Sequence, residues 1–526
     1  MLSFLYEWIL TIVIFLPLAG MAALFFFPKG KDNLVRHFSL GLSIVEFLAS
    51  LLIFKWFRIN ADFQMGDMAF EWIPDYGINY HIGVDGISLF LVLLTTFLTM
   101  IVIINAYSSV KERVREYMIF MFLLETGMLG TFLALNLFLF YVFWELMLIP
   151  MYFLIGIWGG QRRIYAAVKF FIFTMVGSLL MLVAILALVW AYKEQNPTSK
   201  TTFEYLLLLD TKLPMTAQLL MFGAFALAFA IKVPMFPFHT WLPDAHVEAP
   251  TGGSVILAGV LLKMGTYGFL RFAIPLFPDA AIKLIPVMMI LATIGIIYGA
   301  LVSMVQPDLK KLVAYSSVSH LGFVMLGMFA LTTISIEGSV LQMVNHGLST
   351  GALFLLVGVV YERRHTRLIS DFGGLSKVMP IYGTMFMIVM LSSVGLPGLN
   401  GFVGEFLILM GTFTSKVHPA TKAFAVICST GVIFAAVYLL WMFQRVMFGP
   451  VKNTENEKLD DLNLREAVMF LLILVFIFWI GIYPQTFTRR MAPAVKNVVE
   501  RVVPPSLQSS PVIFSRGEEI QKEGAQ

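Results

Sequence analysis

Fourteen stretches of the sequence are each apolar over about twenty residues, the length that an α-helix needs to cross a bilayer. In hydrocarbon every backbone polar group must be satisfied within the structure, and a helix does this within one segment. We therefore predict an all-α polytopic membrane protein with about 14 transmembrane helices. The predicted helices occupy residues 6–27, 34–57, 84–107, 118–135, 136–158, 167–191, 217–238, 251–273, 283–304, 309–331, 335–360, 380–412, 422–447 and 467–484.

Several connections between these helices are too short to contain a separate domain. Residues 1–486 are therefore predicted to form a single transmembrane bundle, and residues 487–526 a polar C-terminal tail. Within the tail, the stretch VVPPSLQSS is typical of a loose strand or coil on the surface. The apolar N-terminus lacks the basic start and the cleavage site of a signal peptide, so we expect it to be the first membrane helix.

Composition excludes several other classes of protein. Hydrophobic residues make up 59% of the chain and charged residues 13%, whereas soluble domains contain about 25% charged residues. The net charge of +4 is small and dispersed, so no nucleic-acid partner is expected. Cys428 is the only cysteine, which excludes a disulfide framework, an Fe–S cluster and a Cys-rich zinc site on this chain.

Two other sequence features do not predict a metal site or a phosphate-binding site. His239 and His246 lack the spacing of zinc ligands, so no metal site is predicted. The glycine-rich stretch GLPGLNGFVGE lies inside a predicted membrane helix and not after a strand, which argues against phosphate binding. We expect no cofactor and no bond-making chemistry on this chain.

The distribution of Lys and Arg predicts the orientation, because cytoplasmic connections are enriched in these residues. With the N-terminus outside, the inner connections carry 19 of the 36 Lys and Arg residues, the outer connections 8 and the tail 6. Lys55 is set aside as a side chain that extends from a helix end to the membrane surface. Both termini are therefore predicted on the outer side. Only Lys232 and Lys263 remain, and both lie inside predicted membrane helices.

Lys263 stands near the middle of the apolar run VILAGVLLKMGTYGFL, about eleven residues from either helix end. A charged side chain at this depth costs about 2.5–3.5 kcal/mol on insertion scales. One interpretation is a structural ion pair. We favour a proton carrier, because a buried lysine is able to load and release a proton near neutral pH.

Lys232 lies in the stretch FALAFAIKVPMFPFHTW, directly before Pro234 and Pro237. Two prolines so close together break a helix, and irregular backbone at membrane depth is tolerated only where protein or water satisfies it. A lysine beside such a break is typical of transporter ion sites. The alternative is a lysine that reaches the membrane surface from a helix end.

Two glutamates and two histidines complete the primary candidates. Glu145 is central to a predicted helix and needs a partner, for which Lys232 is the natural candidate. Glu405 lies in a second helix that glycine and proline interrupt. His320 and His346 lie mid-helix among small and polar residues, so each is either a hydrogen-bonded core residue or part of a proton relay; we favour the relay.

Secondary candidates are Glu46, Glu125 and His239. Each of these side chains is predicted to lie in or beside a membrane helix. The two glutamates are equally compatible with a structural hydrogen-bonding role.

The ionisable residues also suggest an internal repeat. Lys232 and Glu405 are 173 residues apart, and Glu145 and His320 are 175 apart. Adding this offset to the residue numbers makes predicted helices 4–8 (about 118–273) correspond to predicted helices 9–13 (about 283–447). Because five helices are an odd number, the second unit must begin on the opposite side of the membrane. Two inverted repeats, each with a broken helix, are typical of alternating-access carriers, and imply one half-channel on each side.

Three stretches of the sequence resemble a known family: HTWLPDAHVEAPTGGSVILAGVLLKMGTYG, FWELMLIPMYFLIGIWGG and LPGLNGFVGEF. They are similar to the antiporter-like membrane subunits of respiratory complex I, the proton-translocating NADH:quinone oxidoreductase, and among these to the M type (chain 4 in mitochondria). The similarity covers roughly helices 3 to 14. The motif DAHVEAP, together with Glu405, separates this type from subunits L and N, in which a lysine is expected at the position of Glu405.

The resemblance implies a subunit that couples electron transfer, carried out by other subunits, to proton pumping. NADH, FMN, Fe–S clusters and quinone would be held by those partners, which include subunits L and N and the lateral helix of subunit L. Glu145 and Lys232 would interact, and Lys263 would be the central proton carrier. His320 and His346 would join the polar axis. Glu405 would be the exit-side group.

The resemblance also implies a location in a bacterial inner membrane. Two alternatives share the fold: a subunit of a multi-subunit Na⁺/H⁺ antiporter and a subunit of a membrane-bound hydrogenase. Glu405 and the sequence HVEAP argue against both.

Overall fold

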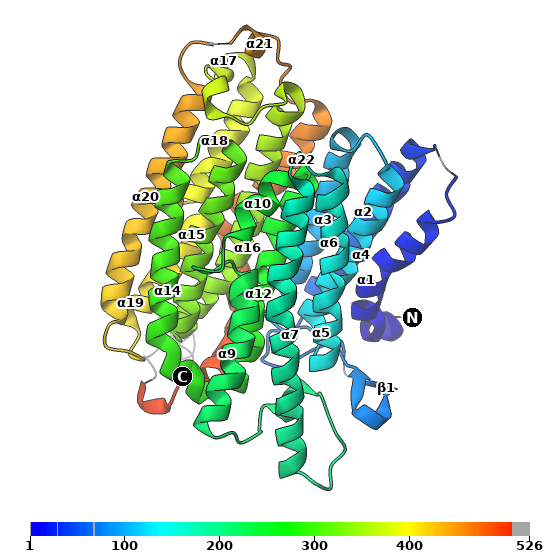
Figure 1. Cartoon of the computed structure of the whole chain (residues 1–526), viewed down its shortest axis with the longest axis vertical. Coiled ribbons are helices and arrows are strands. Elements are labelled where there is room, and N and C mark those ends of the chain that lie inside the picture. Colours follow the sequence, from blue (N-terminus) through cyan, green and yellow to red (C-terminus); the bar gives the residue numbers. More distant parts are fainter. Residues whose placement is uncertain (1, 29, 67–68, 452, 508–526) are drawn as a thin grey trace, which may run out of the picture.

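The computed structural model describes residues 2–28, 30–66, 69–451 and 453–507 as a bundle of long helices that run roughly side by side (Figure 1). Within these residues, 13 helices or joined helices are long and apolar enough to cross a membrane. They are α1 (Leu2–Leu24), α2 (Asp32–Trp56), α3 (Leu89–Ser109), α4 (Val114–Leu133), α5 with α6 (Leu137–Leu146 and Leu148–Trp158), α7 (Arg163–Gln195), α9 (Met215–Lys232), the joined helices of Thr251–Leu276, α14 (Pro278–Met304), α15 (Leu309–Phe329), α16 (Thr333–Arg364), α20 (Thr421–Met447) and α22 (Leu464–Ile482).

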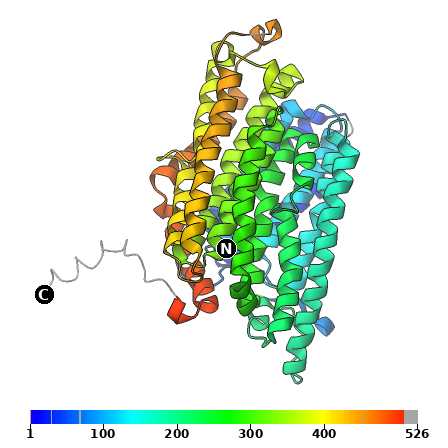
Figure 2. The same cartoon turned by 60° about the vertical axis from the view of Figure 1, so that its left-hand side comes forward.

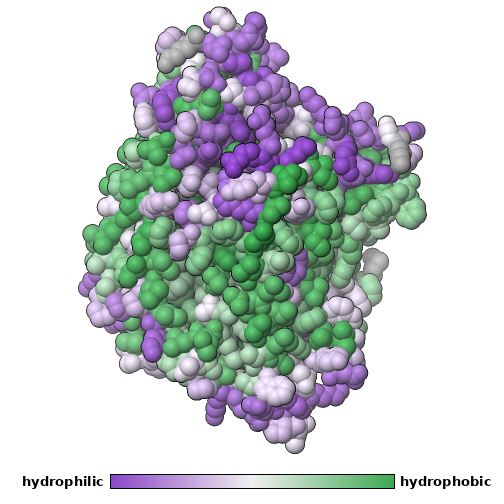
Figure 3. All heavy atoms as spheres, viewed as in Figure 1, coloured by the Kyte–Doolittle hydropathy of each residue, from purple (hydrophilic) through white to green (hydrophobic). Residues whose placement is uncertain are grey.

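The fourteenth predicted crossing, at 380–412, is divided between α18 (Pro380–Val394) and α19 (Asn400–Thr414). The prediction of an all-α polytopic membrane protein is therefore confirmed. The surface agrees with it, because on the face shown in Figure 3 apolar residues form a broad band across the middle of the molecule and hydrophilic residues gather at its two ends. α1 to α7 lie on one side of the bundle and α14, α18, α19 and α20 on the other, whereas α22 returns to contact α3 (Figures 1 and 2).

Short elements connect the long helices. β1 (Phe70–Ile73) and β2 (Ile78–Tyr80) form an antiparallel hairpin that pairs Phe70 with Tyr80. The remaining connecting elements are η1 (Pro74–Tyr76), α8 (Tyr205–Leu208), η4 (Ile369–Asp371), α17 (Leu375–Val378), α21 (Thr454–Glu457) and η5 (Pro505–Leu507).

The first broken helix differs in detail from its prediction. The sequence predicts a helix over 217–238 followed by a connection at 239–250, whereas α9 ends at Lys232 and a second half-helix, α10 (Trp241–Glu248), occupies the connection. Pro234 and Pro237 explain the early end, because neither has a backbone N–H to donate. The Trp241 indole N–H donates to the Ile231 carbonyl at 2.8 Å, so a side chain satisfies a backbone group near the break.

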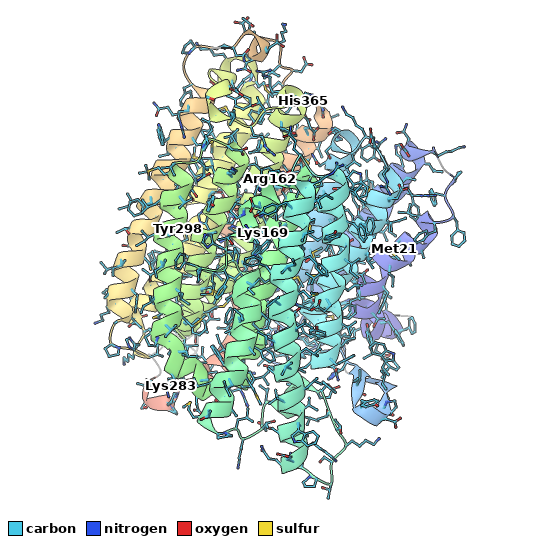
Figure 4. All side chains as sticks on the ribbon, in the orientation of Figure 1. Met21, Arg162, Lys169, Lys283, Tyr298 and His365 are labelled. Carbon is cyan, nitrogen blue, oxygen red and sulfur yellow. The ribbon has the colours of Figure 1, made fainter. Side chains whose placement is uncertain are left out.

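Contacts with α7 hold the second half-helix α10 in place. The Lys169 ammonium donates to the Asp244 carboxylate at 2.7 Å and to the Thr240 carbonyl at 2.9 Å. The Arg162 backbone N–H donates to the Glu248 carboxylate at 2.9 Å. Lys169 and Arg162 lie at the same end of the bundle, beside α10 (Figures 1 and 4).

The second break separates α18 from α19. Gly395 ends α18 with a φ of +87°, and Gly398 follows with a φ of +91°; both values favour glycine. Glu405 is the sixth residue of α19, whereas Lys232 is the last residue before its own break. The two ionisable residues therefore lie at different positions relative to their breaks. The breaks themselves are confirmed, and the inverted repeats over 118–273 and 283–447 stay a prediction.

Two helical segments are buried at the centre of the bundle. One is the joined segment Thr251–Leu276, made of α11 (Thr251–Ile256), η2 (Leu257–Leu261), α12 (Leu262–Gly268), η3 (Phe269–Ala273) and α13 (Ile274–Leu276). Its η2 and η3 parts are π-helical turns, a feature often found at functional sites. The other segment is α16, which packs against α11 and η2.

The C-terminal region contains a helix that the sequence prediction did not include. Residues 487–526 are predicted as a polar tail, but α23 (Gln485–Val502) is helical and packs against α13, α14 and α16. The helix buries one apolar face through Phe487, Met491, Val495, Val498 and Val502. Its other face is polar, which explains why hydropathy alone does not reveal it. The part of the predicted tail at 508–526 lies outside the described residues.

Candidate functional site

Lys263 lies at the centre of the candidate site, on α12, with no exposed surface. Its ammonium donates to the Ala258 carbonyl in the π-helical turn η2 and lies 2.6 Å from Nδ1 of His346 on α16. Among the described residues, no carboxylate forms an ion pair with Lys263. The geometry therefore does not support the alternative of a structural ion pair.

A continuous row of ionisable side chains leads from Lys263 towards α19. The His346 ring lies 5.9 Å from the His320 ring, between centroids. Nδ1 of His320 lies 3.0 Å from the Glu405 carboxylate. All four residues are at most 4% exposed. Lys263, His346, His320 and Glu405 come from α12, α16, α15 and α19, so tertiary packing assembles what we call the central row.

Uncharged polar residues surround the far end of the central row. The Gln342 amide donates to the Glu405 carboxylate at 3.2 Å, and the Asn345 amide donates to the Asn400 carbonyl at 2.7 Å. The Tyr438 hydroxyl lies 3.4 Å from Nε2 of His320. A small polar cavity of about 10 Å³ beside these groups approaches the volume that one water molecule needs. These partners were not predicted, although the stretch QMVNHGLST of α16 is unusually polar for a membrane helix.

Lys232 and Glu145 approach one another less closely than predicted. Lys232 is 1% exposed and lies over the rings of Trp144 and Phe170, at 5.2 and 5.6 Å from their centroids. Its ammonium has no hydrogen-bond partner in the described part of the chain. Glu145, near the end of α5, acts on Lys232 electrostatically, but the two form neither a hydrogen bond nor an ion pair there. Glu145 and Lys232 therefore interact electrostatically, without a direct contact between the carboxylate and the ammonium.

His246 and Lys310 are two further buried groups near the central row. His246 stacks on Phe354 with 4.6 Å between ring centroids, and neither of its ring nitrogens has a partner among the described residues. It interacts electrostatically with Lys263 and Lys310. The Lys310 ammonium is buried and donates to the Ala249 carbonyl at 2.5 Å. On sequence alone, His246 is a candidate only for a metal ligand, and Lys310 is assigned to an inner connection.

The secondary candidates lie in three different environments. Glu46 on α2 and Glu125 on α4 are buried and interact with each other electrostatically. Among the described residues, neither carboxylate is hydrogen-bonded to the central row. His239, in the first break, lies 5.1 Å from the ring of Tyr298, between centroids. Over the described residues, no group of three or more His, Cys, Asp or Glu side chains is arranged to hold a metal ion.

A buried ion pair closes one end of the joined helical segment. Arg271, in η3, lies 2.5 Å from the Asp85 carboxylate, and both side chains are almost fully buried. The same carboxylate accepts from the backbone N–H groups of Ile87 and Ser88, each at 3.0 Å. The charge count had placed Arg271 in an outer connection. This is wrong in detail, because the helix continues to Leu276 and the arginine lies inside the packed bundle.

Replacing Arg271 by methionine should destabilise the folded chain by about 3–5 kcal/mol, because Asp85 would remain buried without its partner. The expected result is a lower Tm and less assembled protein in the membrane. The double variant Asp85→Asn/Arg271→Met removes both charges and should recover much of the loss. Equal thermal stability of the single variant and the native chain would contradict this role.

Comparisons with known proteins agree with this architecture. Residues 134–435 match the family model described as NADH:quinone oxidoreductase/Mrp antiporter, transmembrane. The chain is 46% identical over 492 residues to NADH-ubiquinone oxidoreductase chain 4 of Marchantia polymorpha, covering 93% of this chain and 96% of the relative. It is 44% identical over 508 residues to NADH-quinone oxidoreductase subunit M of Rhodobacter capsulatus, covering 94% and 96%.

Solved structures give the same result at the level of the fold. A chain of respiratory complex I from Thermus thermophilus with bound NADH has a TM-score of 0.84 and 32% identity, covering 94% of this chain and 99% of that one. A chain of the Mrp complex from a Dietzia species shares the fold, with a TM-score of 0.78 at 23% identity, covering 92% and 52%. The chain therefore belongs to the family of transmembrane subunits shared by NADH:quinone oxidoreductases and Mrp antiporters, and its full-length relatives include subunit M, or chain 4, of the oxidoreductase.

Proposed function

We propose that this chain is the proton-translocating, antiporter-like membrane subunit of an NADH:quinone oxidoreductase. The observation that carries the proposal is the central row, in which Lys263 is linked through His346 and His320 to Glu405 inside the bundle. Ionisable residues at membrane depth are costly and mark ion pathways or proton relays. Full-length similarity to subunits named for this oxidoreductase supports the assignment.

In the proposed mechanism, Lys232 takes up a proton beside the first break, and the charge of Glu145 stabilises the resulting ammonium. When that stabilisation weakens, the proton passes to Lys263 through a route that ordered water would complete. Lys263 then releases it to His346, which lies within hydrogen-bond distance. His320 and Glu405 complete the transfer towards the second break. One half-channel would open at each break, on opposite sides of the membrane.

The redox chemistry belongs to partner subunits in this proposal. NADH, FMN, Fe–S clusters and quinone would bind there, and this chain would contribute proton transfer alone. Its neighbours would be the antiporter-like subunits L and N, with the lateral helix of subunit L along its side. The complex would lie in a bacterial inner membrane, with both termini of this chain on the outer side, as the distribution of Lys and Arg favours.

Purification of the chain with its native partners tests the proposal. The purified complex, reconstituted in sealed vesicles, should oxidise NADH with a quinone acceptor and move protons across the membrane in the same assay. A Na⁺/H⁺ antiporter subunit, the alternative that shares the fold, would copurify with partners that oxidise no NADH. Absence of NADH:quinone activity from an intact complex would contradict the proposal.

Glu405 should matter as a proton acceptor rather than as a packing residue. Glu405→Ala removes the acceptor for His320 and Gln342, so proton translocation per NADH should fall strongly. Glu405→Lys restores an ionisable group, as expected in subunits L and N, and should retain part of the activity. The ranking native, then lysine, then alanine is measured in assembled membranes. Native-like translocation by the alanine variant would contradict the role of Glu405.

A further inference from the structure

An apolar groove lies between α2, α3, α16, α22 and α23, away from the central row. Its cavity volume is about 70 Å³. Aromatic rings dominate its lining: Phe47, Phe54, Phe90, Phe97, Phe476 and Trp479. Packing within the chain fixes these rings, because Phe97 lies 4.9 Å from Phe476 and Phe90 lies 4.9 Å from Phe487, between centroids. The groove is therefore built by the fold.

The groove is accessible from the surface of the bundle. Leu51 and Trp479, which line it, are 36% and 41% exposed. The single hydroxyl in its lining, that of Thr486, already accepts from the Trp479 indole N–H at 3.3 Å. The rest of the lining is apolar apart from the Trp479 indole N–H, so the body of a ligand in the groove must be hydrocarbon.

Arg490 of α23 adds positive charge beside the groove, and Arg489 precedes it on the same helix. The Arg490 guanidinium lies 4.3 Å from the centroid of Phe54, and its Nη1 donates to the Thr486 carbonyl at 2.7 Å. Its Nε is buried and has no hydrogen-bond partner in the residues described. No described carboxylate forms an ion pair with either arginine.

The charge of this arginine pair is uncompensated. Burial lowers the pKa of Arg490, and the neighbouring charge of Arg489 lowers that pKa further. Guanidinium groups remain protonated in proteins and bind phosphate in a two-pronged geometry. Arg489 and Arg490 therefore provide hydrogen-bond donors for an anion, and Arg490 does so directly beside the apolar lining of the groove.

We propose that this groove binds an anionic phospholipid, with an acyl chain between the aromatic rings and the headgroup phosphate on Arg489 and Arg490. An apolar helix of a partner would fill the groove without supplying the anion. Inorganic phosphate would satisfy the arginines without the groove. The deep end of the groove reaches Val344 and Leu348 on α16, two residues to either side of His346. A bound chain would thus pack against the helix that carries part of the central row.

Lipid retention by the purified membrane complex tests this inference. The complex is stripped with detergent, incubated with phosphatidylglycerol or phosphatidylcholine, and analysed for bound lipid by mass spectrometry. Arg489→Gln/Arg490→Gln removes the headgroup contacts, and Leu93→Trp fills the groove without changing charge. Lys496→Gln is the matched control, because Lys496 lies on the same helix, is exposed and pairs with Glu500 at 3.5 Å.

The native complex and the Lys496→Gln control should retain phosphatidylglycerol, and inorganic phosphate should not displace it. Arg489→Gln/Arg490→Gln should retain about tenfold less, because it loses the charge-assisted hydrogen bonds to the headgroup. Leu93→Trp should also retain less, because the larger side chain occupies the space of the acyl chain. Equal retention by the double-arginine variant, or equal binding of phosphatidylcholine, would overturn the proposal. So would displacement by phosphate, or a partner helix seated in the groove of the assembled complex. The test requires no proton pumping, so its outcome is independent of the proposed function.

Discussion

Lys263→Met should nearly abolish proton translocation, while NADH oxidation falls with it because the two are coupled in the proposed function. Lys263 is the lysine of the central row, 2.6 Å from His346, and it is fully buried. A positioned side chain that transfers a proton contributes about 10²–10⁴-fold to a rate. Methionine preserves much of the volume and removes the proton-binding group, so the complex should still assemble.

Lys263→Arg separates a proton carrier from a fixed charge. The guanidinium keeps its proton, because its pKa is above about 12. Arginine should therefore impair translocation nearly as strongly as methionine. Lys283→Met is the matched control, since Lys283 is exposed at one end of the bundle (Figure 4) and should leave translocation unchanged. Near-normal translocation by the arginine variant would show that Lys263 supplies only charge.

Glu145→Ala should have the second-largest effect. The Lys232 ammonium is buried without a hydrogen-bond partner among the described residues, so its charge depends on Glu145 and on the faces of Trp144 and Phe170. Aromatic faces contribute about 2 kcal/mol when desolvated, less than the several kcal/mol that an uncompensated buried charge costs. Without Glu145, Lys232 should lose its proton and uptake should stop.

The measurement is proton translocation per NADH in vesicles that contain the assembled variant complex. Glu145→Asp keeps the charge and should retain part of the activity, which separates electrostatics from packing. Glu71→Ala, which changes an exposed carboxylate on β1, serves as the control. Native-like translocation by assembled Glu145→Ala would remove Glu145 from the proposed pathway.

The sequence allowed prediction of the membrane helices and of all four residues in the central row. Hydropathy reports burial in lipid, so the apolar runs and the isolated Lys263 are directly visible in it. Helix-to-helix contacts are not visible in this way, because His320, His346 and Glu405 meet only through the packing of α15, α16 and α19. Their proximity had to come from the structure.

The features that were placed wrongly from the sequence also depend on tertiary contacts or on periodicity, which mean hydropathy does not report. The half-helix α10 contains Pro243, Asp244 and His246, so its composition is typical of a connection although it is helical and mostly buried. Arg271 counted as an outer charge because it lies close to the predicted helix end, and its buried partner Asp85, distant in the sequence, is evident only in the structure. The amphipathic helix α23 is polar on average, and its apolar face is evident only at helical periodicity.

The most direct test of the central claim follows the proton itself, by infrared difference spectroscopy of the reconstituted complex during NADH oxidation. The carboxyl stretching band of a protonated glutamate should appear and decay with turnover, and Glu405→Gln should abolish it. Because Lys263 supplies the proton through His346 and His320, Lys263→Met should also abolish the band although Glu405 is intact. A turnover-dependent Glu405 band that is unchanged in Lys263→Met would contradict proton transfer along this row.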